Sequence, residues 1–375
     1  METNKIFNEI KGNFGFGYMR LPMKGESVDI EECNKMVDAF LDAGFNYFDT
    51  AHGYLNGLSE KAIKECLSDR YPRDKYILTN KLTAAFFKKE EDIRPLFEKQ
   101  LNACGVDYFD FYLMHAQSAT NFKQYKECKA YETAFKLKEE GKIKHVGLSF
   151  HDKPEVLDEI LSTYPEVEAV QIQFNYLDYD DSAIQSKAVL DVCIKHNKPV
   201  IVMEPVKGGR LINLPEKAQS LIDELDGGSN ASYAIRFAAS EEQVFMTLSG
   251  MSNLLQMNDN LSFMKSFTPL NNKERECLFK VAEVFKSMSL INCTGCKYCI
   301  TENKCPKNID IPGLFSTKNA KEMFKDSSGT YYYSLYTSEG NKASDCIRCG
   351  MCERVCPQHL NIRELLQKVA ETFEK

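Results

Sequence analysis

Short apolar runs alternate with longer amphipathic stretches along residues 1 to 287 of the chain. Continuous apolar runs bounded by polar residues are typical of strands in a parallel sheet, where both faces are covered. Eight such strands are predicted, at residues 14–19, 47–50, 76–81, 109–115, 145–150, 169–175, 200–205 and 244–250. The stretches between them repeat apolar residues with helical periodicity, at residues 30–43, 60–68, 91–103, 125–140, 154–162, 183–196 and 229–239.

This alternation of strands and helices indicates an α/β fold. Eight strands with helices between them, over about 250 residues, match a closed (β/α)8 barrel, the TIM barrel. An open, doubly wound sheet is the alternative, and its first strand should lead into a G-x-G-x-x-G turn. Gly12, Gly15 and Gly17 instead lie before and within the first predicted strand. The pattern therefore favours a barrel over residues 1–287.

The connection at residues 208–230, after the seventh predicted strand, is longer than usual for a barrel. Loops at this end of a barrel crowd the catalytic face, so the connection is interpreted equally as a lid or as a surface insertion. A helical stretch at residues 273–288 follows the last strand. We predict that it leads into a second domain, at residues 288–375.

Eight of the fourteen cysteines lie in two strings near the C-terminus. The strings read Cys293-x2-Cys296-x2-Cys299-x5-Cys305-Pro306 and Cys346-x2-Cys349-x2-Cys352-x3-Cys356-Pro357. In bacterial two-cluster ferredoxins, the fourth cysteine of each string ligates the other cluster. The spacing predicts a small, helical and loop-rich ferredoxin-like domain with two [4Fe-4S] clusters, one bound by Cys293, Cys296, Cys299 and Cys356 and one by Cys346, Cys349, Cys352 and Cys305.

Structural zinc is the alternative for these cysteines, but zinc sites use two well-separated pairs of ligands. Five residues separate Cys299 from Cys305, a wider gap than in the second string. The cost of closing a loop rises slowly with its length, so Cys305 can still reach its cluster. The remaining cysteines are scattered and are expected to be buried, reduced thiols: Cys33, Cys66, Cys104, Cys128, Cys193 and Cys277.

Charge and hydropathy exclude several classes of partner. The net charge is −7 and no run of Lys or Arg stands out, whereas nucleic-acid binding needs a clustered basic face. The N-terminal residues lack the apolar core of a signal peptide, and no stretch of about 18 apolar residues offers a membrane span. We therefore expect a cytoplasmic protein that binds neither nucleic acid nor membrane.

Polar residues stand at the ends of three neighbouring predicted strands, where a barrel places its active site. Asp49 ends the second strand and Tyr54 follows it, Lys81 ends the third strand, and His115 ends the fourth. Each alone has an ordinary structural role, such as a helix cap or a core histidine. Together they form a proton-delivery unit: an ammonium held by a carboxylate favours a phenolate, and a histidine orients a carbonyl oxygen.

Residues 44–60, Gly-Phe-Asn-Tyr-Phe-Asp-Thr-Ala-His-Gly-Tyr-Leu-Asn-Gly-Leu-Ser-Glu, resemble the signature of the aldo-keto reductases. Lys81 and His115 match the remaining positions of that family's catalytic tetrad, and the resemblance covers residues 10–265. It implies that Tyr54 is the general acid/base, that Asp49 and Lys81 tune it, and that His115 orients a small carbonyl or alcohol substrate. The whole chain is similar to the iron–sulfur branch of the family.

The resemblance also implies a nicotinamide cofactor. Ser149 and Gln173 match residues that bind the carboxamide, and residues 250–260 resemble the adenosine-phosphate site, with Gly250, Ser252, Gln256 and Asn260. Members that prefer NADP commonly have basic residues near two of these positions, but Gly250 and Gln256 are not basic. A 2′-phosphate wants a basic partner, so NAD(H) or NADP(H) is expected without a strong preference for NADP.

The combination leaves the role of the clusters open. Nicotinamide transfers two electrons as a hydride, whereas each cluster passes one, and coupling them normally needs a mediator such as a flavin. The leading hypothesis is an iron–sulfur oxidoreductase that interconverts a carbonyl and an alcohol. The alternatives are an electron-transfer protein that serves a redox partner protein, and clusters that are only structural or that sense oxygen.

Overall fold

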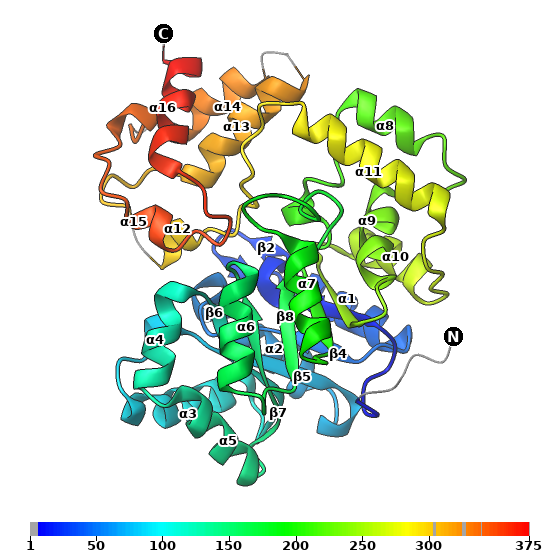
Figure 1. Ribbon diagram of the computed structural model, residues 1–375, viewed down its shortest axis with the longest axis vertical. Coiled ribbons are helices and arrows are strands. Elements are labelled where there is room, and N and C mark those ends of the chain that lie inside the picture. The colour runs from blue at the N-terminus through cyan, green and yellow to red at the C-terminus, as the bar shows by residue number, and fades with distance from the viewer. Residues whose placement is uncertain (1–6, 303–304, 325–327, 339, 375) are drawn as a thin grey trace. The chain divides into compact units, whose positions relative to one another are not determined.

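The computed structural model describes residues 7–302, 305–324, 328–338 and 340–374 (Figure 1). The chain divides into two compact units. The barrel unit comprises Met1–Pro205 and Ala231–Asn271, and the cysteine unit comprises Val206–Asn230 and Asn272–Lys375. The domain boundary expected between residues 287 and 288 stays a prediction, and the compact units group residues 206–230 and 272–287 with the C-terminal part.

Eight parallel strands close into a barrel, which confirms the expected (β/α)8 fold. Their order around the barrel is β1, β4, β5, β6, β7, β8, β9 and β10, and β1 pairs with both β4 and β10 to close it. The strands are β1 Phe14–Gly17, β4 Tyr47–Asp49, β5 Ile77–Leu82, β6 Phe109–Gln117, β7 Ile143–Phe150, β8 Ala169–Gln173, β9 Val200–Met203 and β10 Val244–Gly250. Each falls on a predicted apolar run.

The interior of the barrel is filled by side chains, as in other barrels of this size. Its core includes Tyr47, Phe111, Ile201, Met246 and Leu248, all buried. Large side chains fit because small residues stand opposite them. A Cβ atom at Gly15, for example, would lie 2.6 Å from the Leu248 side chain. A packed interior leaves the ends of the strands as the place for a reaction.

Most helices of the barrel unit fall on the predicted amphipathic stretches, but one predicted helix is divided in two and the helix at residues 254–264 was not predicted. The helices are α1 Ile30–Asp42, α2 Leu58–Ile63, α3 Glu90–Cys104, α4 Ala119–Glu127, α5 Ala130–Glu139, α6 Pro154–Thr163, α7 Ser186–Lys195, α9 Asn230–Ala239 and α10 Leu254–Met264. The single helix predicted at residues 125–140 is wrong, because the chain breaks there into α4 and α5. Lys129, between them, has a φ of 48°, which no α-helix accommodates. A short hairpin of β2 Met23–Lys24 and β3 Ser27–Val28 was not predicted.

The cysteine unit is built of helices around its own core. They are α8 Glu216–Ile222, α11 Asn272–Lys286, α12 Tyr298–Thr301, α13 Ile311–Phe324, α14 Ser328–Tyr336, α15 Met351–Arg354 and α16 Ile362–Phe373. Leu314, Phe315, Leu366 and Val369 form much of the buried core. Among the described residues, no helix has the length and apolar character needed to span a membrane.

The long connection after β9 belongs to the cysteine unit. Within it α8 packs along α11, where the Cys277 thiol donates to the carbonyl of Leu221 at 3.2 Å. Further on, Arg210 donates to the carbonyl of Ile291 at 3.1 Å and to the side chain of Asn292 at 2.9 Å, just before the first cysteine string. The segment is therefore an integral part of this unit.

Candidate active site and cysteine cavities

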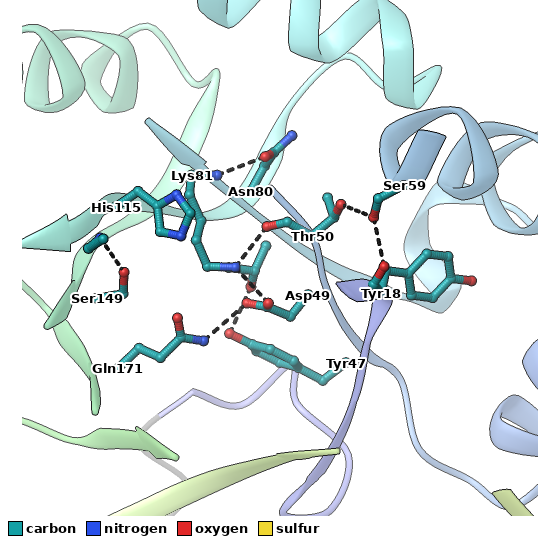
Figure 2. Close-up of polar contacts among 12 residues, drawn as sticks. Tyr18, Tyr47, Asp49, Thr50, Ser59, Asn80, Lys81, His115, Ser149 and Gln171 are labelled. Carbon is teal, nitrogen blue, oxygen red and sulfur yellow. Dashed lines mark hydrogen bonds and ion pairs between the residues drawn. The ribbon is translucent and has the colours of Figure 1, made fainter. Parts of the chain in front are cut away.

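The predicted tetrad gathers at one end of the barrel. Asp49, Lys81 and His115 come from the adjacent strands β4, β5 and β6, and Tyr54 begins the short 3-10 helix η2 Tyr54–Gly57 that follows β4. Parallel strands end at the same rim of a barrel, so three neighbouring strand ends bring these side chains together. Figure 2 shows Lys81 extending toward Asp49, with His115 beside it.

The centre of the group is a buried ion pair. The Lys81 Nζ donates to Asp49 Oδ1 at 2.6 Å and to the carbonyl of Thr50 at 2.8 Å (Figure 2). The other Asp49 oxygen accepts from Gln171 at 3.2 Å. Burial alone would lower the pKa of Lys81, but Asp49 and Tyr54 outweigh it and hold that pKa above its ordinary value. The side chain therefore stays an ammonium although solvent does not reach it.

Tyr54 lies against this ammonium. The Lys81 Nζ is 4.9 Å from the centre of the Tyr54 ring, and that ring meets the His115 ring edge-to-face at 5.9 Å. The turn that carries Tyr54 is unusual, because Leu55 and Asn56 have φ values of 51° and 55°. Such values are uncommon for residues other than glycine and cluster at functional sites.

His115 is held as a neutral ring. Its Nδ1 lies 2.6 Å from the Thr83 hydroxyl, and its carbonyl accepts from the Tyr125 hydroxyl at 2.9 Å. Burial, the Lys81 charge and His151 lower its pKa well below 6.5. A neutral imidazole beside Tyr54 can orient a polar oxygen without competing with Lys81 as a cation.

We expect the His115 ring to stay uncharged as a solution is acidified from pH 8 to about pH 6. Burial also lowers the pKa of His145, but hydrogen bonds with Glu168 and Glu9 raise it above its ordinary value, so His145 should gain its proton first. NMR of the histidine ring carbons, assigned with His115→Gln and His145→Gln, measures both titrations. A His115 signal that titrates at or above pH 6.5 would contradict this expectation.

The two residues expected at the nicotinamide carboxamide lie at the ends of β7 and β8. The Ser149 hydroxyl accepts from the backbone N–H of Ala116 at 2.7 Å, and Gln173 Nε2 donates to Asp178 at 2.7 Å. Both side chains are buried. The fold thus brings them to the tetrad's end of the barrel and fixes each with a hydrogen bond.

The segment expected at the adenosine phosphate, residues 250–260, runs from the end of β10 into the first turns of α10. Gly250 ends the strand, and the Ser252 N–H donates to Gln256 Oε1 at 2.8 Å. Asn260 is buried and donates to the Ser249 hydroxyl at 3.0 Å. Asn253 caps α10 by accepting from the backbone N–H of Gln256 at 2.9 Å. Two of the expected cofactor residues, Gln256 and Asn260, therefore also hold the segment itself together.

One basic residue here was missed from the sequence. Side-chain carbons of Arg20 lie 3.3–3.4 Å from the point where a Cβ atom at Gly250 would stand. The Arg20 carbonyl also accepts from the Ser252 hydroxyl at 2.8 Å. Arg20 follows β1, which is far from β10 in sequence and adjacent to it in the closed barrel. No local motif signals this proximity.

The eight cysteines of the two strings line two separate cavities. One cavity is lined by Cys293, Cys296, Cys299 and Cys356, together with Pro357. The other is lined by Cys305, Cys346, Cys349 and Cys352, together with Pro306. Within the described residues, no three His, Cys, Asp or Glu side chains form a site for a single metal ion. Each cavity is instead lined by three cysteines of one string and by the fourth cysteine of the other string.

The two cavities share a backbone device. The N–H of Gly295 lies 3.4 Å from the sulfur of Cys293, and the N–H of Arg348 lies 3.4 Å from that of Cys346. Both donors have positive φ values, 66° and 57°. Such N–H···S bonds stabilise the negative charge of an iron–sulfur cluster. Both cavities therefore fit an anionic cluster bound by thiolates.

Comparison with known proteins agrees with both parts of the chain. Residues 13–281 match the family model described as the aldo/keto reductase family, and residues 292–360 match the one described as a 4Fe-4S dicluster domain. An aldo-keto reductase from Bacillus halodurans in its holo form is 25% identical, with a TM-score of 0.59, covering 72% of this chain and 91% of that one.

Two further proteins are similar to the barrel part of the chain. The NADH-specific methylglyoxal reductase of Escherichia coli (strain K12) is 26% identical over 216 residues, which are 52% of this chain and 62% of that protein. An aldo-keto reductase from Klebsiella pneumoniae, solved in complex with NADPH, is 18% identical with a TM-score of 0.58, covering 72% of this chain and 90% of that one. This last likeness concerns the fold alone. With its closed barrel and its match over residues 13–281, the chain is an oxidoreductase that belongs to the aldo/keto reductase family and carries a C-terminal 4Fe-4S domain.

Proposed function

We propose that the barrel interconverts a small carbonyl compound and its alcohol, with Tyr54 as the general acid/base. The observation that carries this proposal is the position of the Lys81 ammonium, 2.6 Å from Asp49 Oδ1 and 4.9 Å from the centre of the Tyr54 ring. Few structural roles require a fully buried cation between a carboxylate and a phenol, since burying charges is costly. An ammonium beside the phenol stabilises the phenolate that forms when the proton is transferred to an alkoxide.

Each residue of the tetrad has a distinct role in this proposal. In reduction, the Tyr54 hydroxyl gives its proton to the carbonyl oxygen, and in oxidation the phenolate takes that proton back. The Lys81 ammonium stabilises the phenolate, and Asp49 keeps Lys81 charged and in place. The neutral ring of His115 orients the carbonyl oxygen. A bound nicotinamide supplies or accepts the hydride, which the chain itself cannot do.

The residues at the expected cofactor site fit a nicotinamide dinucleotide. Ser149 and Gln173 present polar groups at the tetrad's end of the barrel, and the segment from Gly250 to Asn260 leads into the N-terminus of α10, which favours a phosphate. Neither Gly250 nor Gln256 is basic, while Arg20 lies beside Gly250. Because Arg20 offers one basic side chain for a 2′-phosphate, we propose that the site accepts either NAD(H) or NADP(H).

An assay that follows the oxidation of NADH or NADPH tests this proposal. Purified protein should oxidise NADH or NADPH when a small dicarbonyl such as methylglyoxal is added, and should leave the cofactor unchanged without it. Bound small molecules should be released from the same preparation and identified. Turnover that requires an added flavin, or a failure to oxidise either nicotinamide with any of a panel of small aldehydes and ketones, would contradict the proposal.

We further propose that the cysteine cavities hold two [4Fe-4S] clusters with crossed ligands. Cys356 lines the cavity of the first string and Cys305 that of the second, although each belongs to the other string in sequence. This arrangement supports the exchange of fourth ligands that the spacing predicts. The six scattered cysteines are buried free thiols, which supports a reducing, cytoplasmic location.

Double substitutions should show which cysteines share a cluster. Cys356→Ser should lower iron from about eight to about four atoms per chain, because it opens one cluster site. Adding Cys293→Ser should remove little more, since both residues serve the same cluster. Adding Cys346→Ser should remove the remaining iron. Iron and sulfide analysis of anaerobically purified variants measures these losses. If adding Cys293→Ser removed the remaining iron and adding Cys346→Ser removed little more, the crossed ligand sets would be wrong.

We propose, second, that the clusters exchange electrons with a redox partner protein. Cys349 is exposed and the neighbouring Ile347 is 56% exposed, so the second cavity opens at the surface of its unit. An exposed ligand edge suits electron exchange with another protein better than a purely structural role. Anaerobic titration with dithionite should bleach the visible absorbance of the clusters. Clusters that no cellular donor can reduce would exclude electron transfer and leave a structural role.

A further inference from the structure

A buried carboxylate outside the tetrad links two of the tetrad's segments. Glu60, near the start of α2, is 1% exposed. One of its oxygens lies 2.7 Å from His52 Nδ1, and the other accepts from Asn80 Nδ2 at 2.9 Å. A carboxylate has no hydrogen to donate, so the His52 Nδ1 carries the hydrogen in this contact. Burying such a group is costly unless it is paired and hydrogen-bonded, as Glu60 is here.

The first arm of this link reaches Lys81. Asn80 Oδ1 accepts from the backbone N–H of Lys81 at 2.8 Å (Figure 2). The same oxygen accepts from Gln100 Nε2 at 3.1 Å. Gln100 Nε2 also donates to the Lys81 carbonyl at 3.0 Å, and Gln100 Oε1 accepts from the Tyr112 hydroxyl at 2.6 Å. The backbone of Lys81 is thus held on both its N–H and its C=O by side chains connected to Glu60.

The second arm reaches the turn that carries Tyr54. His52 stands two residues before Tyr54, and its ring meets the Phe86 ring edge-to-face at 4.8 Å. The turn passes through three residues in succession with positive φ, at positions 55 to 57. Two of them are not glycine, so the turn needs support from its surroundings to persist. His52 before the turn and Glu60 after it close that segment with a hydrogen bond.

We propose that Glu60 is a positioning residue that fixes the Tyr54 hydroxyl relative to the Lys81 ammonium. This inference rests on the proposed carbonyl–alcohol chemistry of the same site. Glu60 would act through His52 and Asn80, the two side chains to which it is hydrogen-bonded. A displacement of about 1 Å in such a site can lower the rate by about 100-fold.

Asp110→Asn provides a matched control for Glu60→Gln. Asp110 is also a fully buried carboxylate, which binds Arg73 at 2.6 Å and the backbone N–H of Leu78 at 2.8 Å. Asp110 lies near the start of β6 and Leu78 near the start of β5, at the opposite end of these strands from the tetrad. Loss of its charge should affect stability in a similar way and should leave the tetrad's geometry intact.

Glu60→Gln should lower kcat about 10- to 100-fold while KM and the dissociation constant of the reduced nicotinamide stay within about two-fold. Asp110→Asn should keep kcat within about two-fold, even if its Tm falls equally. A Glu60→Gln protein with wild-type kcat, measured beside an inactive Tyr54→Phe protein, would overturn the positioning role and leave the proposed function standing. Absence of nicotinamide-dependent turnover in the wild type would instead overturn the proposed function.

A pair of variants at His52 keeps the test decisive if Glu60→Gln fails to fold. His52→Leu removes the donor to Glu60, and His52→Asn retains an amide N–H near the position of Nδ1. We expect kcat to fall in His52→Leu and to recover most of the way in His52→Asn, with folded protein in both cases by circular dichroism. Equal kcat values in these two variants would overturn the inference.

Discussion

Replacement of Tyr54 with phenylalanine is expected to lower kcat about 100- to 10,000-fold, the usual contribution of a positioned general acid. The substitution removes one hydroxyl and keeps the ring, whose centre lies 4.9 Å from the Lys81 Nζ and which packs against His115. Substrate and nicotinamide should therefore still bind. Steady-state oxidation of NADH by a small dicarbonyl, together with the dissociation constant of NADH from its fluorescence, separates the two effects.

The control for this variant is Tyr47→Phe. Tyr47 is also a buried tyrosine on the segment around Asp49, and its hydroxyl accepts from Thr79 at 2.7 Å inside the barrel. Loss of that hydroxyl should cost some stability and little activity. If Tyr54→Phe retained wild-type kcat, the assignment of Tyr54 as proton donor would be wrong, whatever the effect of Tyr47→Phe.

Lys81→Met is expected to abolish measurable turnover and to destabilise the fold by about 3–5 kcal/mol at neutral pH, since it leaves a buried carboxylate unpaired. The methionine fills the space of the lysine stem, so the main loss is the charge beside Asp49. Denaturant unfolding measures the stability, and the carbonyl reduction assay measures the activity.

The destabilisation should depend on pH in a defined direction. Burial raises the pKa of Asp49 above its ordinary 3.8, and loss of Lys81 removes the cation that opposes this shift. The folded variant then binds a proton that the unfolded chain releases, so its stability falls as pH rises above about 4. The deficit relative to wild type should be smaller near pH 5 than near pH 8.

The double variant Asp49→Asn with Lys81→Met separates stability from catalysis. Removing the unpaired charge should restore much of the free energy of unfolding, and turnover should stay absent because the ammonium is missing. A Lys81→Met protein as stable as wild type at pH 8 would contradict the ion pair, and an active one would contradict the role of Lys81.

The barrel could be predicted because each of its strands is buried on both faces and therefore appears as an apolar run. The grouping of Asp49, Lys81 and His115 could be predicted for a related reason, since they stand on neighbouring strands, at the same rim of the barrel. The helix break at Lys129 could not, because a single left-handed residue leaves the apolar periodicity almost unchanged on either side. Nor did the pattern show that the segment after β9 packs on α11, since amphipathicity does not name the partner.

Residues that act through tertiary contacts were harder to find. Arg20 reaches Gly250 only because the closed barrel places β1 beside β10. Glu60 belongs to the matched signature, yet its link to Asn80 crosses from α2 to β5 and appears only in three dimensions. The crossed grouping of Cys305 and Cys356, by contrast, was predictable because the spacing of the strings reflects how a chain wraps around two clusters.

We propose that the barrel transfers a hydride directly from a bound nicotinamide to the carbonyl carbon, while Tyr54 supplies a proton to the carbonyl oxygen. Reduction of methylglyoxal with NADH deuterated at both C4 positions tests it most directly, with the product examined by mass spectrometry and NMR. Direct hydride transfer predicts one deuterium on the new carbinol carbon of every product molecule. A product without deuterium at that carbon would show that its new hydrogen came from solvent, by way of the clusters or a flavin, and would contradict direct hydride transfer from the nicotinamide.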